Sequence, residues 1–232
     1  MTNIELVNKH LDVAKNYKTI YGWGCFGFPV TEAILQEKKK QYPDWYTDQK
    51  MAMYRKLIGQ GYFMFDCVNL TKGIIWGWNG NKNAVYGGAR YGANGCPDYT
   101  ADGMIKICRD VSANGWSDMV VGEALWMPGH WGLYVGDGLA VECTPAWNNG
   151  VQITAVGNIG QKAGYNARTW KKHGKIPFVD YIDSDKKDPA KEKHDKNKAN
   201  VKSRFGFDDN TIAWLDTYKY NKALFEKLAN AK

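Results

Sequence analysis

The hydrophobic pattern changes its period near residue 120, and no other feature constrains the fold as much. Before that point apolar residues recur at helical spacing, and after it short β-rich segments are divided by Gly, Pro or Asn. Helices followed by antiparallel strands predict an α+β domain. We expect helices at residues 2–20, 31–41, 47–58, from Cys67 onward and at 101–109, and strands at 121–127, 130–135, 139–143, 151–156 and 175–181.

Side-chain caps support two of these helix starts. Thr2 or Asn3 is a candidate cap for the first helix, and Asp66 is a good cap for a helix that begins at Cys67. Between that helix and the strands, residues 77–97 are rich in glycine and polar residues and predict a loop.

A charged run divides the chain near its C-terminal end. Residues 183–203 contain seven Lys and five acidic residues, which predicts a solvated linker between a body of residues 1–182 and a segment of residues 204–232. In that segment Asp209 or Asn210 is a candidate helix cap, and a second helix follows near residues 223–228. About thirty residues bury little core. We therefore expect the segment to dock, to self-associate or to bind a target.

Composition and charge limit the classes of partner. The net charge is +7, which favours anionic partners, but no Arg-rich stripe of the kind that reads nucleic acid is present. The 10 Trp and 14 Tyr fit either an aromatic core or grooves that take carbohydrate or wall polymers. The N-terminus lacks the pattern of a signal peptide, and no apolar run approaches the ~20 residues of a membrane span. We expect synthesis in the cytoplasm and no membrane partner.

Five cysteines, with no CxxC pair, predict neither a disulfide framework nor a zinc site, and we expect no metal and no cofactor. Cys67 is the candidate nucleophile. At the first turn of a helix it feels the positive end of the macrodipole, which favours the thiolate. A buried, inert cysteine is the alternative.

A cysteine nucleophile needs a base, and His130 is the best placed of the four histidines. His10 lies in the first predicted helix, His173 follows two lysines near a turn, and His194 lies in the predicted linker. His130 follows a Pro-Gly turn and begins an apolar strand, where the imidazole can be held rigidly. A third polar group would orient the ring.

The hairpin after His130 offers two candidates for that third group. A three-residue turn at Gly136–Gly138 would pair Gly132 with Glu142 and put the carboxylate on the face of His130. A two-residue Asp-Gly turn would put Cys143 there instead. Strand geometry alone leaves the choice open.

These motifs together resemble the NlpC family of papain-like wall peptidases. That family has an Asp-Cys pair at a helix start, then a Gly-Asp-like strand, then His-x-Gly-x-Tyr-x-Gly and a polar orienter. The matching residues cover roughly residues 4–181: Asp66-Cys67, Gly122-Glu123, His130-Trp-Gly132-Leu-Tyr134-Val-Gly136 and Glu142. Val68-Asn69 replaces the family's Ser-Gly, and Glu142 stands where His, Asn or Gln is usual.

The resemblance implies a papain-like fold, with N-terminal helices packed on an antiparallel sheet and a small C-terminal helical segment. It also implies a thiol mechanism in which Cys67 attacks, His130 acts as the base and Glu142 orients the ring. It places Tyr21, Asp66 and Trp131 near the substrate or the oxyanion.

The implied function is hydrolysis of peptidoglycan stem peptides, with the bond from D-γ-glutamate to the diamino acid as the expected target. The protein would act as a phage or prophage lysin, reaching the wall after release by a holin-type partner. The C-terminal segment would bind anionic wall polymers or self-associate. The alternatives are an N-acetylmuramoyl-L-alanine amidase or acyltransferase with the same dyad, and a non-catalytic wall-binding protein.

Overall fold

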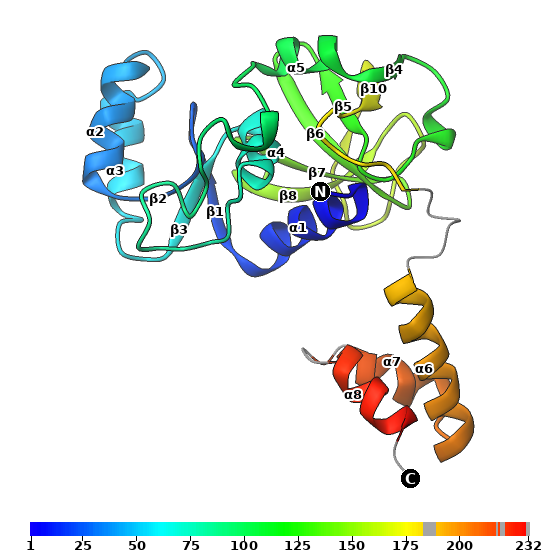
Figure 1. The fold of residues 1–232 in the computed structure, drawn as a ribbon. Coiled ribbons are helices and arrows are strands. Elements are labelled where there is room, and N and C mark those ends of the chain that lie inside the picture. The colour runs from blue at the N-terminus through cyan, green and yellow to red at the C-terminus, as the bar shows by residue number, and fades with distance from the viewer. Residues whose placement is uncertain (183–188, 217, 219–220, 231–232) are drawn as a thin grey trace. The chain divides into compact units, whose positions relative to one another are not determined.

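The computed structural model describes the chain apart from residues 183–188, 217, 219–220 and 231–232, and apart from the side chains of residues 189–195 and 222. The chain forms two compact units, Met1–Tyr181 and Ile182–Lys232. The first unit has the α+β architecture that the change of period predicts (Figure 1).

Helices in the first unit begin where the sequence supplies a side-chain oxygen as a cap. Thr2 and Glu5 form a capping box at the first helix, and Thr31, Thr47 and Thr100 each accept a hydrogen bond from a backbone N–H of the first turn. The predicted helices are confirmed, although the first is shorter than expected. They are α1 (Asn3–Asn16), α2 (Glu32–Gln41), α3 (Asp48–Arg55), α4 (Cys67–Ile75) and α5 (Ala101–Ile107), with short 3₁₀ turns at Ala93–Gly95 and Trp116–Asp118.

The strands of the first unit form two sheets. The larger has the order β4-β10-β5-β6-β7-β8-β9 and is antiparallel except for the parallel pair β8 and β9. Its strands are β4 (Arg109–Ser112), β5 (Ala124–Met127), β6 (His130–Gly136), β7 (Leu139–Thr144), β8 (Gly150–Val156), β9 (Ala167–Arg168) and β10 (Lys172–Lys175).

The smaller sheet was not predicted from the sequence. It has the order β1-β3-β2, with β1 (Lys18–Tyr21) parallel to β3 (Tyr62–Phe65) and β2 (Phe26–Pro29) antiparallel to it. Residues 18–20 were expected to be helical, and β3 consists of four consecutive apolar residues whose period is ambiguous. The predicted strand at 175–181 is also wrong, because β10 ends at Lys175.

Helices α1 and α4 pack against each other and against the central strands of the large sheet. A buried histidine joins them. His10 Nδ1 donates to the Leu6 carbonyl (2.9 Å), so Nε2 is an acceptor and takes the Thr71 hydroxyl (2.9 Å). Thr71 Oγ1 in turn accepts from the Trp131 indole (3.1 Å). This chain of hydrogen bonds ties α1 and α4 to β6, and it assigns His10 a structural role.

The second unit consists of helices, including one where a linker was expected. Its helices are α6 (Pro189–Phe205), α7 (Asp209–Asp216) and α8 (Asn221–Ala229). Val201 of α6 is fully buried with Ile212 and Phe225 in a small core. The linker prediction for residues 183–203 is therefore wrong where the chain is helical. A helix that buries only a few apolar residues has nearly the same composition as a solvated linker, so composition does not distinguish the two. Residues 183–188 lie outside the described residues.

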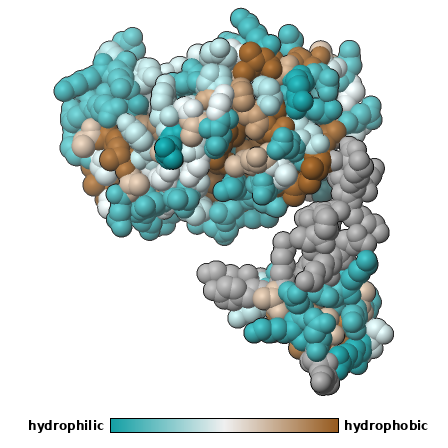
Figure 2. Space-filling model, viewed as in Figure 1, coloured by the Kyte–Doolittle hydropathy of each residue, from teal (hydrophilic) through white to brown (hydrophobic). Residues whose placement is uncertain are grey.

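On the face that Figure 2 shows, hydrophilic and apolar residues are mixed over the coloured part of each unit. Over the described residues, no helix has both the length and the apolar character needed to cross a bilayer.

The His10 network predicts acid sensitivity. Burial lowers the pKa of His10 from 6.5 to about 4, so the unfolded chain binds its proton first as the pH falls. The stabilisation by neutral His10 is thus present above pH 6.5 and is lost on acidification towards pH 4, by about 3 kcal/mol at most.

The measurement is urea unfolding of the wild type and of His10→Gln between pH 7.5 and 4.5. The unfolding free energy of the wild type minus that of His10→Gln should shrink as the pH falls. Asp66 changes stability in the opposite direction, because burial raises its pKa to about 6. Both proteins contain Asp66, so its contribution cancels in the subtraction. A difference that stays constant with pH would contradict the assignment.

Candidate active site

Cys67 begins α4 directly after β3, and Asp66 caps this helix as predicted. Asp66 Oδ1 accepts from the Asn69 backbone N–H (2.8 Å). Its Oδ2 accepts from Gly24 N–H (3.0 Å) and from the Asn69 side chain (2.6 Å). The capping carboxylate therefore also holds the Gly24 loop beside Cys67.

Cys67 is 6% exposed, and its Sγ lies 3.9 Å from the Gly129 carbonyl oxygen. Burial, followed by the charge of Asp66, raises the pKa of Cys67 to about 12, and hydrogen bonds from backbone groups and from Tyr21 only partly oppose this rise. The helix terminus by itself therefore does not make Cys67 a thiolate. A reaction at this sulfur needs a base to remove the proton.

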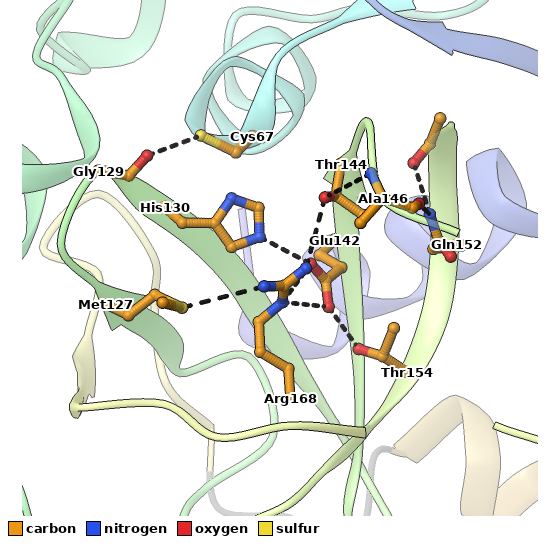
Figure 3. Close-up of polar contacts among 11 residues, drawn as sticks. Cys67, Met127, Gly129, His130, Glu142, Thr144, Ala146, Gln152, Thr154 and Arg168 are labelled. Atoms are coloured by element: carbon orange, nitrogen blue, oxygen red, sulfur yellow. Dashed lines mark hydrogen bonds and ion pairs between the residues drawn. The ribbon is translucent and has the colours of Figure 1, made fainter. Parts of the chain in front are cut away.

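His130 lies at the start of β6, and its Nε2 is 2.6 Å from Glu142 Oε2 on β7. An ionised carboxylate only accepts, so Nε2 carries a proton and Nδ1 is free to act as the base. Figure 3 shows the free edge of the ring turned towards Cys67. Trp170 stacks on the imidazole with ring centroids 5.5 Å apart and planes 6° apart, which fixes the plane of the ring.

Glu142, and not Cys143, lies beside His130. The hairpin combines the two-residue turn of one predicted alternative with the strand pairing of the other. The turn has the two residues Asp137 and Gly138, both with positive φ, and a bulge at Val135–Gly136 shifts the register so that Gly132 pairs with Glu142. Cys143 therefore faces the opposite side, where its thiol donates to the Phe65 carbonyl (3.2 Å).

Glu142 is fully buried, and three side chains satisfy its carboxylate. Besides His130, Thr154 donates to Oε1 (2.7 Å), and Arg168 Nε lies 2.9 Å from Oε1 and 2.7 Å from Oε2. Burial acts to raise the pKa of Glu142, but the bonds from His130 and Arg168 outweigh it and hold the pKa below its usual value. Glu142 is therefore a carboxylate at neutral pH.

Arg168 is the main residue of this site that sequence reasoning missed. It lies in β9, which joins the sheet edge by parallel pairing with β8, and its guanidinium sits between the rings of Trp147 and Trp170 at 4.8 and 5.7 Å. It also donates to Thr144 Oγ1 (3.4 Å). A single arginine in a polar stretch does not stand out in the sequence as a site residue. Only the pairing of β9 with β8 brings Arg168 to Glu142.

Asp102 of α5 is a second residue that the sequence analysis missed. Its Oδ1 accepts from the Gly129 backbone N–H (2.8 Å) and from the Trp126 indole (2.9 Å). The carboxylate thus anchors the turn that carries the Gly129 carbonyl next to Cys67.

Three residues were predicted near the substrate. Tyr21 and Asp66 lie beside the Cys67 thiol, whereas the side chain of Trp131 points away from the cavity. Tyr21 on β1 is in contact with Cys67, and Tyr21 and Asp66 both line the cavity there. The Trp131 indole is 0% exposed and bonded to Thr71, so it cannot contact a substrate. Its place in β6 directs the ring into the core, and only its backbone faces Cys67.

A cavity of about 680 Å³ opens onto the thiol. Among the five free cysteines, all of which are described, Cys67 alone lines it. His130 and Glu142 are not among the residues that line the cavity. Across the described residues, no cluster of three or more His, Cys, Asp or Glu side chains is arranged to hold a metal ion.

Comparisons with protein-family models, with curated proteins and with solved structures found no match to this chain.

The Arg168–Glu142 pair yields a prediction about pH. Without the guanidinium, the effect of burial is less opposed, so the pKa of Glu142 should rise and the carboxylate that orients His130 should become protonated at a higher pH. For Arg168→Gln we expect kcat/KM to fall about tenfold, equal to about 1.4 kcal/mol, and the acid limb of the pH–rate profile to move to higher pH.

Arg168→Lys is the matched control because it keeps the charge and loses the forked geometry. It should lower the rate while leaving the acid limb near that of the wild type. An unchanged limb in Arg168→Gln would mean that Arg168 only supports the fold.

Proposed function

We propose that this chain is a cysteine peptidase that hydrolyses amide bonds in peptidoglycan stem peptides. The observation that carries the proposal is the arrangement of three groups from α4, β6 and β7: a thiol at the end of a cavity, an imidazole with a free Nδ1 turned towards it, and a buried carboxylate on Nε2 (Figure 3). Nucleophilic catalysis at carbonyl carbon needs these three roles.

The proposed reaction proceeds through a thioester. His130 Nδ1 removes the Cys67 proton as the sulfur attacks the amide carbon, and the imidazolium then protonates the leaving amine. Water, deprotonated by His130, hydrolyses the thioester and returns the free thiol. Because the pKa of the resting thiol is raised to about 12, proton transfer accompanies attack.

The developing oxyanion needs donors beside the sulfur. The backbone N–H of Cys67, at the amino end of α4, and the Tyr21 hydroxyl are the groups we assign to it. Glu142 and Arg168 together carry no net charge, so the orienting group behaves much like the neutral amide found at this place in other thiol peptidases.

The wall substrate and the bond rest on the motif resemblance to NlpC-type papain-like peptidases. The histidine strand is its most specific part, and the cavity is open enough for an extended peptide. We propose cleavage between D-γ-glutamate and the diamino acid, by a lysin that reaches the wall after release by a holin-type partner. For the second unit, with Phe205 and Trp214 exposed, we propose attachment to the wall or self-association.

Replacing the reacting groups should abolish the activity while the fold remains. Cys67→Ala should lower peptidoglycan hydrolysis by about 10³-fold or more, and His130→Ala by about 10²–10⁴-fold. Cys108→Ala is the matched control because Cys108 is half-buried and lies outside the cavity. A Cys67→Ala protein that clears peptidoglycan at the wild-type rate would refute the mechanism.

Product analysis tests the bond. Mass spectra of digested lysine-type and diaminopimelate-type peptidoglycan should show a new free amine on the diamino acid. A freed L-alanine amine would instead identify an amidase that uses the same dyad. Peptidoglycan that binds the protein but yields no product would support the non-catalytic alternative.

A further inference from the structure

The cavity at Cys67 collects most of the exposed aromatic rings of the first unit. Within Met1–Tyr181, Trp147 and Tyr165 are exposed elsewhere, and the other exposed Trp and Tyr residues all line this one cavity. They are Trp23, Tyr42, Tyr86, Tyr91 and Tyr99, between 36% and 59% exposed.

Several of these rings are held in place from behind. Tyr91 contacts Phe26 and Trp76 with centroids 5.8 and 4.9 Å apart, and its hydroxyl donates to Asp98 Oδ2 (2.7 Å). Tyr86 contacts Phe26 and Phe28 at 5.1 and 5.0 Å. Phe26 and Phe28 are buried. The exposed faces of Tyr86 and Tyr91 are therefore ordered before any ligand arrives, which lowers the entropic cost of binding.

The chemistry of these rings indicates an amphipathic ligand. All five carry a polar atom, four phenolic hydroxyls and one indole N–H, while the phenylalanines of the cavity lie buried beneath them. A site for an apolar side chain has no need of this polar rim. A sugar ring matches it, because its C–H face packs on an aromatic face while its hydroxyls bond to the rim.

Charge on the cavity wall favours a neutral sugar over an anionic polymer. The wall carries Glu37, Asp66, Asp98 and Asp102 against Lys38 and Lys72. Lys72 is already engaged by Asp98 (2.5 Å) and by the Tyr99 carbonyl (2.7 Å). A phosphate-rich polymer would meet like charge here. The volume of about 680 Å³ leaves room for a sugar ring beside a short peptide.

We propose that this aromatic cavity binds a neutral N-acetylated sugar of the substrate, and that the enzyme acts on stem peptides still attached to glycan. Tyr91 and Tyr99 form the platform for the ring. The biological meaning of the site rests on the proposed peptidase function, but sugar binding can be measured without cleavage.

Binding of chitotriose, a trisaccharide of N-acetylglucosamine, to the full chain measures the site directly. Titration calorimetry should detect binding by the wild type, a dissociation constant at least about tenfold larger for Tyr91→Ala and for Tyr99→Ala, and a smaller increase for Tyr91→Phe, which keeps the ring and loses only the hydroxyl. Tyr165→Ala is the matched control because Tyr165 is exposed outside the cavity.

Tyr99 has no ring contact among the described residues, so Tyr99→Ala tests the platform even if Tyr91→Ala disturbs the packing. Absence of binding by the wild type would overturn the proposal. An equal loss of binding in Tyr165→Ala would also overturn it.

A kinetic comparison separates failure of this inference from failure of the proposed function. The wild type should cleave a disaccharide-linked stem peptide with a kcat/KM about tenfold above that for the free peptide, and Tyr99→Ala should remove the preference. Chitotriose binding with no cleavage of either substrate would refute the peptidase and leave the sugar site standing. Equal cleavage of both substrates without chitotriose binding would refute the sugar site and leave the peptidase.

Discussion

The buried carboxylate of Glu142 is the constraint around which the candidate site is built. A carboxylate without solvent contact is stable only if its lone pairs are engaged and its charge is balanced. His130, Thr154 and Arg168 meet both needs, and they come from β6, β8 and β9. The contacts of this one carboxylate, which lies on β7, therefore join four adjacent strands. They also set the tautomer of the imidazole and leave Nδ1 as the nitrogen without a proton. Trp170 closes the arrangement by fixing the plane of the ring.

The thiol is located by a separate set of contacts. Asp66 caps α4 and holds the Gly24 loop, while Asp102 anchors the turn of Gly129. The hydrogen-bond chain from His10 through Thr71 to the Trp131 indole links α4 to β6. Since Trp131 follows His130 directly, this chain couples the helix that begins at Cys67 to the strand that begins at His130. A buried histidine and a buried tryptophan are thus structural residues that position the two reactive groups.

The cavity and the Glu142 centre differ in exposure and in polarity. The carboxylate of Glu142 is buried and fully paired, whereas the cavity wall is open, aromatic and rich in hydroxyl groups. Such a division suits the proposed function, in which a fixed set of reacting groups serves a large amphipathic substrate. The packing of Phe26 and Phe28 beneath the tyrosines shows how the aromatic-rich composition serves both the core and the surface.

Local patterns in the sequence determined the α+β class, the first-unit helices, the Asp66 cap and the candidate roles of Cys67 and His130, because caps and periodicity depend on neighbouring residues. Glu142 was reached only as one of two alternatives, and a bulge at Val135–Gly136 decided it. The small sheet, Arg168 and Asp102 depend on contacts across 20 or more residues, which no local pattern encodes. No local pattern gives the direction of the Trp131 ring either, since its hydrogen bond to Thr71 across the core decides it. The sequence by itself therefore determined which residues are candidates for the reacting groups. The tertiary structure decided which partners surround them, because a buried charge finds its counter-ion through folding and not through spacing along the chain.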